Sequence, residues 1–256
     1  MKRNLLNSLI LVALAVPGVA MAEDSPVSAN VGFVSDYLVR GISQTSGGPA
    51  LQGGIDYALE SGFHLGLWGS NISWIKDFGA TGTSSLEVDT YAGYGGSFAD
   101  DYSYDVGYIR YNYLGDYTPV VGTVKADTSE VYGSIGYKWV SAKYSYSLGD
   151  FLGVPNSKGT NYVEVNASYT LEGMGLDLGA HYGKQTYVGA EADAAKAAGF
   201  DPSYADYKLS VAKDVGGYVI GLAYSNTNAK KDAFYTTGLG KNLARSAGVL
   251  SVLHAF

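Results

Sequence analysis

Apolar and polar residues alternate with a period of two along most of the chain after residue 26. In residues 51–60 the odd positions include Leu51, Ile55 and Tyr57, and the even positions include Gln52 and Asp56. Successive side chains of a β-strand point to opposite faces, so this pattern predicts a strand with one apolar and one polar face. The same alternation recurs along the chain at fairly even intervals.

About twelve segments show this alternation, and their connections alternate in length. Connections after even-numbered segments are tight, such as Ser61-Gly62, whereas those after odd-numbered segments are long, such as 115–129 and 185–204. Short periplasmic turns, long extracellular loops and an even strand count are typical of outer-membrane barrels. We therefore predict an all-β fold, a transmembrane antiparallel up-and-down β-barrel of about 12 strands. The predicted strands are residues 27–40, 50–60, 63–74, 86–98, 103–113, 130–139, 141–148, 161–171, 175–184, 205–214, 218–227 and 243–256.

Exposing polar groups to hydrocarbon is costly, and this cost decides which face of the barrel contacts lipid and which faces the interior. A spanning sheet must close on itself, with its apolar face toward lipid and its polar face inward. Aromatic residues at two levels of the apolar face would form the girdles of a membrane barrel, unless tyrosine simply favours strands. The expected outward aromatic residues are Tyr57, Phe63, Tyr94, Tyr104, Tyr137, Trp139 and Tyr169 near the tight turns, and Tyr182, Tyr207 and Tyr224 near the long loops.

The N-terminus has the features of an export signal. Lys2 and Arg3 precede the apolar segment Leu9 to Val16, and Ala20-Met21-Ala22 provides small residues for cleavage. This order is typical of a secretory signal peptide rather than of an anchor helix. We predict a signal in residues 1–22, a barrel in residues 23–256, and the outer membrane of a Gram-negative bacterium as destination.

The C-terminus carries a second marker of this class. Phe256 ends a segment in which His254, Val252 and Leu250 occupy alternate positions. A terminal Phe on an alternating strand is the usual signal for the barrel-assembly machinery, which we expect as a partner along with outer-membrane lipid. His254 stands where Tyr or an apolar residue is more common, and a chance terminal Phe is the alternative.

Composition narrows the functional classes. The 256 residues include 35 Gly, 23 Tyr and no Cys, which favours strands and turns and excludes thiolate metal sites and disulfides. The net charge is −7, and removal of Lys2 and Arg3 with the signal makes it −9. This charge argues against nucleic acid as a partner.

Several stretches resemble the TorF-type porins of proteobacterial outer membranes. The residues that carry the resemblance are 35–45 (SDYLVRGISQT), 49–58 (PALQGGIDYA), 66–71 (GLWGSN), 142–147 (AKYSYS) and 206–211 (DYKLSV). The resemblance covers most of the mature chain and implies a porin. It implies no particular substrate and no functional residues.

Charged residues of the polar face are the candidate pore lining. They are Arg40, Asp56, Glu87, Asp89, Asp105, Glu130, Lys138, Lys143, Glu164, Asp177, His181 and Lys208. Glu87, Glu130 and Glu164 each begin a strand after a long loop, and a ring of carboxylates at the mouth would favour cations. The alternative is that they pair with Lys and Arg or face water. We also expect Asp105 to pair with Lys138.

Two features do not fit a simple barrel. Arg110 shares the parity of outward residues, where an arginine at the bilayer midplane costs about 2–4 kcal/mol. A bulge that turns it inward is our prediction, and a position near the upper interface is the alternative. The Ala-rich residues 189–199 predict a short helix ending at Gly199, exposed in a loop rather than folded into the mouth.

No catalytic motif or cofactor site is evident. His64, His181 and His254 lie on separate strands without metal-ligand spacing, and no Gly-x-Ser-x-Gly elbow occurs. We predict a non-enzymatic, narrow pore for passive diffusion of small hydrophilic solutes, mildly favouring cations. A structural or surface-interaction barrel with an occluded lumen is the main alternative. An outer-membrane lipid enzyme and a soluble periplasmic binding barrel are disfavoured.

Overall fold

The computed structural model describes residues 25–230 and 234–256, so the predicted signal peptide, residues 1–22, lies outside the described part. Within that part, twelve strands form a closed antiparallel barrel. They are β1 (Val27–Val34), β4 (Ala50–Ala58), β5 (Phe63–Asn71), β7 (Leu86–Phe98), β8 (Tyr102–Leu114), β10 (Thr128–Tyr137), β11 (Val140–Ser147), β12 (Asn161–Leu171), β13 (Leu176–Thr186), β14 (Tyr204–Val215), β15 (Tyr218–Thr227) and β16 (Ala247–Ala255).

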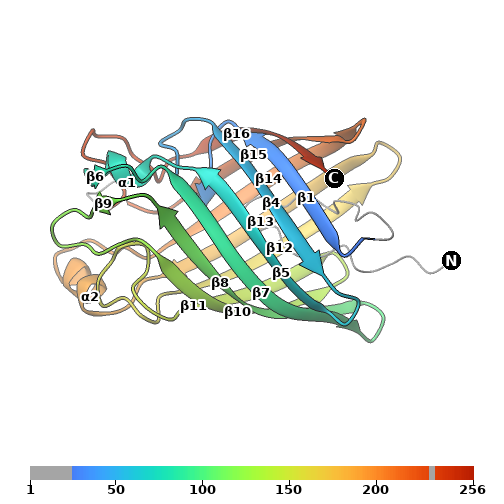
Figure 1. Cartoon of the computed structure of the whole chain (residues 1–256), viewed down its shortest axis with the longest axis horizontal. Coiled ribbons are helices and arrows are strands. Elements are labelled where there is room, and N and C mark those ends of the chain that lie inside the picture. Colours follow the sequence, from blue (N-terminus) through green and yellow to red (C-terminus); the bar gives the residue numbers. More distant parts are fainter. Residues whose placement is uncertain (1–24, 231–233) are drawn as a thin grey trace.

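The barrel is closed by β1, which pairs with both β4 and β16. Each barrel strand from β4 to β15 pairs with the barrel strands that precede and follow it in the chain. Tight turns join strands at one end, and the long loops gather at the other end with the two helices (Figure 1). The predicted fold class, strand number and alternation of connections are confirmed. The first strand is shorter than expected, because the chain leaves the barrel wall after Val34.

The outer surface carries the apolar face of the strands. Leu51 is 64% exposed and Leu209 60% exposed, whereas inward neighbours such as Gln52 and Asp206 are buried. This is the reverse of a water-soluble barrel. Most of the aromatic residues expected on the outer face are exposed there: Tyr57, Phe63, Tyr94, Tyr137, Trp139, Tyr169, Tyr182, Tyr207 and Tyr224. Tyr104 is partly covered by packing against Tyr94 and Phe98.

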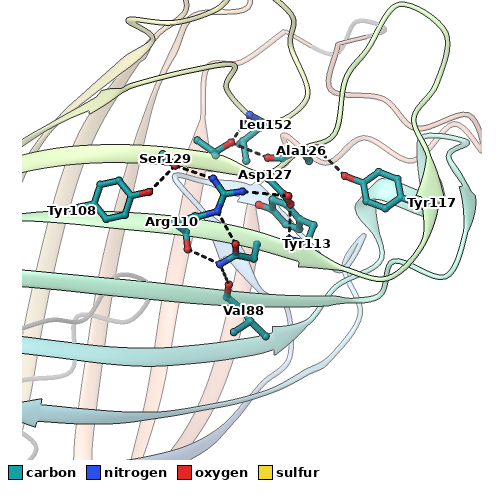
Figure 2. Close-up of polar contacts among 11 residues, drawn as sticks. Val88, Tyr108, Arg110, Tyr113, Tyr117, Ala126, Asp127, Ser129 and Leu152 are labelled. Carbon is teal, nitrogen blue, oxygen red and sulfur yellow. Dashed lines mark hydrogen bonds and ion pairs between the residues drawn. The ribbon is translucent and has the colours of Figure 1, made fainter.

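Arg110 stays on the outer face of β8, and the prediction of a bulge is wrong. The pairing of β8 with β7 and β10 runs without interruption, with Arg110 opposite Thr90 and Ser129. Its guanidinium donates to Asn112 Oδ1 at 2.9 Å and to Ser129 Oγ at 3.2 Å, and lies 3.6 Å from the Asp127 carboxylate (Figure 2). Arg110 is therefore stabilised by polar neighbours near the long-loop end of the barrel.

The long loops contain short elements of their own. They are the hairpin of β2 (Leu38–Val39) and β3 (Ile42–Ser43), the helix α1 (Trp74–Asp77), the pair of β6 (Thr81–Gly82) and β9 (Tyr117–Thr118), and the helix α2 (Ala190–Ala197). The predicted loop helix is confirmed as α2, which is mostly exposed and is followed by Gly199 at a φ of 89°. Among the described residues, neither helix is long and apolar enough to cross a membrane.

The interior is packed at the long-loop end. Buried Tyr37, Tyr111 and Tyr113 belong to one cluster, and Phe151 and Tyr204 belong to a second. Toward the tight turns the inward positions carry small residues that are only half-buried, such as Ser134, Gly179 and Ser210. The packed mouth positions the loop of residues 35–49, which forms the candidate site.

Candidate functional site

The loop between β1 and β4 folds into the barrel instead of covering it. Its β2–β3 hairpin turns through Arg40 and Gly41, whose φ angles are 49° and 78°. Two left-handed residues in succession are typical of the tight hairpin turns that match strand twist. A Cβ on Gly41 would lie 2.7 Å from the Cβ of Asp206 on β14. The hairpin tip therefore reaches the inner face of a strand that is three positions away from β1 around the barrel.

Arg40 connects the hairpin to the opposite wall. Its two terminal nitrogens donate to both carboxylate oxygens of Glu130 on β10, at 3.1 and 2.7 Å, and Nη1 also donates to Gln185 Oε1 at 2.9 Å. The guanidinium carbon lies 4.4 Å from the ring centroid of Tyr162. Burial lowers the pKa of Arg40, but the Glu130 carboxylate together with the tyrosines Tyr111 and Tyr162 raises it overall, so the guanidinium stays charged.

Other hairpin residues bind to the walls beside β1. Tyr37 donates its hydroxyl hydrogen to Glu87 Oε1 on β7 at 2.9 Å. Asp36 accepts from Ser43 and from Arg245, which belongs to the loop between β15 and β16. Burial raises the pKa of Asp36, and the Ser43 hydrogen bond and the Arg245 charge oppose that rise. The hairpin is thus held at three sides of the mouth.

A polar network lines the inner faces of β12, β13 and β14. His181 lies at its centre, with Nδ1 2.6 Å from Asn166 Oδ1 and Nε2 3.1 Å from Asp206 Oδ2. Tyr162 donates to Asp206 Oδ1 at 2.8 Å, and Glu164 lies 3.5 Å from His181 Nδ1. The network joins the predicted residues His181 and Glu164 on one wall.

The two predicted lysines of the lumen lie on the same side. Lys143 on β11 is the cross-strand neighbour of Glu164, and its Nζ lies 4.1 Å from the ring centroid of Tyr132. Lys208 on β14 is the cross-strand neighbour of His181. Both lysines therefore lie beside carboxylates or an imidazole.

The opposite wall carries acids with few bases. Glu87 and Asp89 on β7 are buried, and Asp56 on β4 accepts a hydrogen bond of 2.6 Å from Tyr91. Asp105 on β8 lies 3.5 Å from His64 Nε2. These residues descend from the long-loop end toward the tight turns, so this wall is the more negative one.

Two of the predicted residues lie near the tight turns. Lys138 sits in the turn between β10 and β11, half-exposed, with its ammonium 3.5 Å from Asp101. The expected inward position of Lys138 and its pairing with Asp105 are therefore wrong, because the left-handed turn breaks the alternation at that residue. Asp177 is the second residue of β13, next to the turn, and accepts a 2.7 Å hydrogen bond from Thr170.

Sequence reasoning missed four residues of this site. Tyr162 and Asp206 have the inward parity of Glu164 and Lys208, so strand alternation could have identified them. Gln185 follows the parity of His181 in the same way. Tyr37 lies in a loop and has no such signal. Among the described residues, no group of three His, Asp or Glu side chains is arranged to hold a metal ion.

A family model described as "Bacterial protein of unknown function (Gcw_chp)" matches residues 20–256. The chain belongs to this family. No curated protein matches its sequence.

A solved porin shares the fold. A structure titled "KdgM porin" is 11% identical, with a TM-score of 0.51, and the match covers 90% of this chain and 99% of that one. The KdgM porin in complex with disordered oligogalacturonate is 10% identical, with a TM-score of 0.49 and coverage of 90% and 98%. OccAB3 of Acinetobacter baumannii is 13% identical, with a TM-score of 0.44 and coverage of 92% and 66%. At these identities the likeness to the KdgM porin shows a common fold only.

Proposed function

We propose that this protein is an outer-membrane, porin-like channel for passive diffusion of small hydrophilic solutes. The observation that carries the proposal is the combination of an apolar outer face with a charged inner face in a closed barrel. A sheet in hydrocarbon must leave no edge unpaired, and this barrel meets that requirement. A soluble binding barrel would need the opposite arrangement of faces.

The proposed location rests on further features. The signal-like residues 1–22, the terminal Phe256 and the resemblance to TorF-type porins all favour export and insertion by the barrel-assembly machinery. The exposed Tyr and Trp side chains at both ends of the outer face favour contact with lipid headgroups. We propose no enzymatic activity.

The charges of the lumen favour cations. The wall from β4 to β10 carries Asp56, Glu87, Asp89 and Asp105, while the basic Lys143 and Lys208 lie on the other side. Acidic rings and patches in a pore select cations. Arg40 and Glu130 neutralise each other, so Glu130 follows the alternative in which the carboxylates pair with Lys or Arg. The remaining acidic residues supply the mild preference for cations.

An occluded barrel is the second candidate, because the hairpin crosses the mouth. Arg40 of the hairpin bonds to β10 and Gly41 packs against β14, on different sides of the lumen. A structural or surface-interaction barrel would keep this hairpin permanently in place. The channel requires the hairpin to move out of the mouth at times, whereas the occluded barrel does not.

Planar-bilayer recording of the purified, folded protein separates the two. A channel predicts discrete conductance steps with a cation preference in a salt gradient. Complete absence of steps, both in the natural chain and in a chain whose residues 37–46 are replaced by a Gly-Ser linker, would reject the channel. Steps that occur only in the linker variant would favour the occluded barrel.

A further inference from the structure

Beneath the hairpin, Glu87 and Asp89 form a pair of buried carboxylates with no basic partner. Their exposed fractions are 0% and 1%. Among the described residues, Glu87 Oε2 and Asp89 Oδ1 have no hydrogen-bond partner. The charged groups that act on Asp89 are two more carboxylates, Glu87 and Glu130, and Glu130 is already bound by Arg40. Neither Glu87 nor Asp89 takes part in an ion pair among the described residues.

Such a pair is unfavourable unless something neutralises it. Burying an ionised carboxylate is costly without a partner, and two neighbouring carboxylates repel each other. Tyr37 donates only to Glu87 Oε1, so it leaves the other oxygen of that carboxylate unpaired. A cation that approaches Glu87 Oε2 and Asp89 Oδ1 would give both oxygens a partner.

The neighbouring side chains offer only oxygen ligands. Glu87 and Asp89 point to the same face of β7, about 6–7 Å apart along the strand. At the level of Glu87 the register places Ser70 on one side and Tyr113 on the other, with Gln52 one strand beyond Ser70. Carboxylate, amide and hydroxyl oxygens are the ligands that Ca²⁺ accepts, at about 2.3–2.6 Å.

We propose that Glu87 and Asp89 bind one divalent cation of the Ca²⁺ type beneath the hairpin, bridging Glu87 Oε2 and Asp89 Oδ1. One divalent ion balances both carboxylates, whereas a monovalent ion would leave one charge uncompensated. Because only two carboxylates contribute, the affinity belongs to the weak class of Ca²⁺ sites, with a Kd of about 10⁻⁴–10⁻³ M. The ion also lies where Tyr37 holds the hairpin, so it supports the closed mouth.

Calorimetric titration of CaCl₂ into the folded, chelator-treated full chain in detergent tests the site. We expect one Ca²⁺ per chain, bound at least about tenfold more weakly in Glu87→Gln and in Asp89→Asn. Asp56→Asn is the matched control, because it removes one charge from the same wall but leaves the pair intact. Its Ca²⁺ affinity is expected to change less than about twofold.

A second measurement guards against variants that fold poorly. Tb³⁺ binds Ca²⁺ sites and luminesces when nearby tyrosines are excited, and Tyr37 lies against Glu87. Tb³⁺ luminescence that Ca²⁺ displaces in the natural chain, and that Asp89→Asn abolishes, would support the site. No saturable Ca²⁺ binding by the natural chain, or an equal loss in Asp56→Asn, would overturn it. Binding requires no open pore, so a chain that binds Ca²⁺ but never conducts would reject the channel alone.

Discussion

Replacing Arg40 with Ala is expected to open the mouth of the barrel. The Arg40 side chain is 12% exposed and that of Glu130 is 1% exposed, so their ion pair is buried. It links the hairpin tip to β10, which lies five strands from β1 around the barrel. The substitution removes both hydrogen bonds to Glu130 and the one to Gln185.

The expected magnitude follows from the carboxylate that is left behind. Removing one partner of a buried ion pair costs about 3–5 kcal/mol, since the other charge stays buried without compensation. When the hairpin opens, Glu130 becomes exposed to water and this cost is removed. The substitution therefore raises the free energy of the closed state and not that of the open state. Because about 1.4 kcal/mol corresponds to a tenfold change, the open-to-closed ratio rises by about two to four orders of magnitude.

Single-channel recording measures this ratio as the fraction of time at the higher conductance level. A natural channel that is open for about 1% of the time would become open for at least about half of it. Glu130→Gln is expected to act in the same direction. The double variant is expected to change the ratio by less than the product of the two single effects, because both remove one interaction.

Arg245→Ala is the matched control for Arg40. Arg245 also binds the hairpin, at Asp36, but its guanidinium is 45% exposed and Asp36 keeps the hydrogen bond from Ser43. Because the guanidinium is already half in water and Asp36 keeps its hydrogen bond, we expect a smaller change in the open-to-closed ratio than in Arg40→Ala. The reasoning is refuted if folded Arg40→Ala protein gates like the natural chain, or if Arg245→Ala has an equal effect.

Three further predictions concern other parts of the barrel. Asp56→Asn and Asp105→Asn are each expected to lower cation preference, seen as a reversal potential closer to zero in a KCl gradient; unchanged potentials would remove these acids from the conduction path. Deletion of residues 190–197 is expected to leave the unitary conductance unchanged, because α2 is mostly exposed, and a changed conductance would make that loop a lid. Arg110→Ala is expected to lower the free energy of unfolding in urea by less than about 1 kcal/mol, since its 44% exposed guanidinium pairs loosely with Asp127; a larger loss would contradict the peripheral position.

The barrel could be predicted because its strands and turns can be recognised from residues that are close together in the sequence. Apolar and polar residues alternate along each strand, which shows the strand and its two faces. Short gaps between these alternating segments show the tight turns. Parity held even at Arg110, where the cost of an outward charge suggested a bulge, because Asn112, Asp127 and Ser129 lie close enough to pair with it. It failed at Lys138, where a φ of 53° in the turn interrupts the alternation.

The hairpin could not be predicted, since its contacts join distant parts of the chain. Arg40 and Glu130 are 90 residues apart, and Asp36 and Arg245 are 209 apart. Side chains in a loop do not alternate between two faces as they do in a strand. The sequence around the loop therefore does not indicate whether it turns outward or inward. Sequence reasoning identified Arg40 and Glu130 separately but had no basis for pairing them.

The inward hairpin also answers how a twelve-stranded barrel packs its mouth. Barrels of eight strands are filled by their own side chains, and wider ones leave a hollow. Here Tyr37 supplies packing at the long-loop end, whereas the inward positions near the tight turns stay small and half-buried. The contacts that pack the mouth are therefore the ones that we propose keep it closed. Arg40→Ala should raise the open fraction and lower the thermal stability together, and a gain in conductance without any loss of stability would show that the hairpin blocks the pore without supporting the barrel.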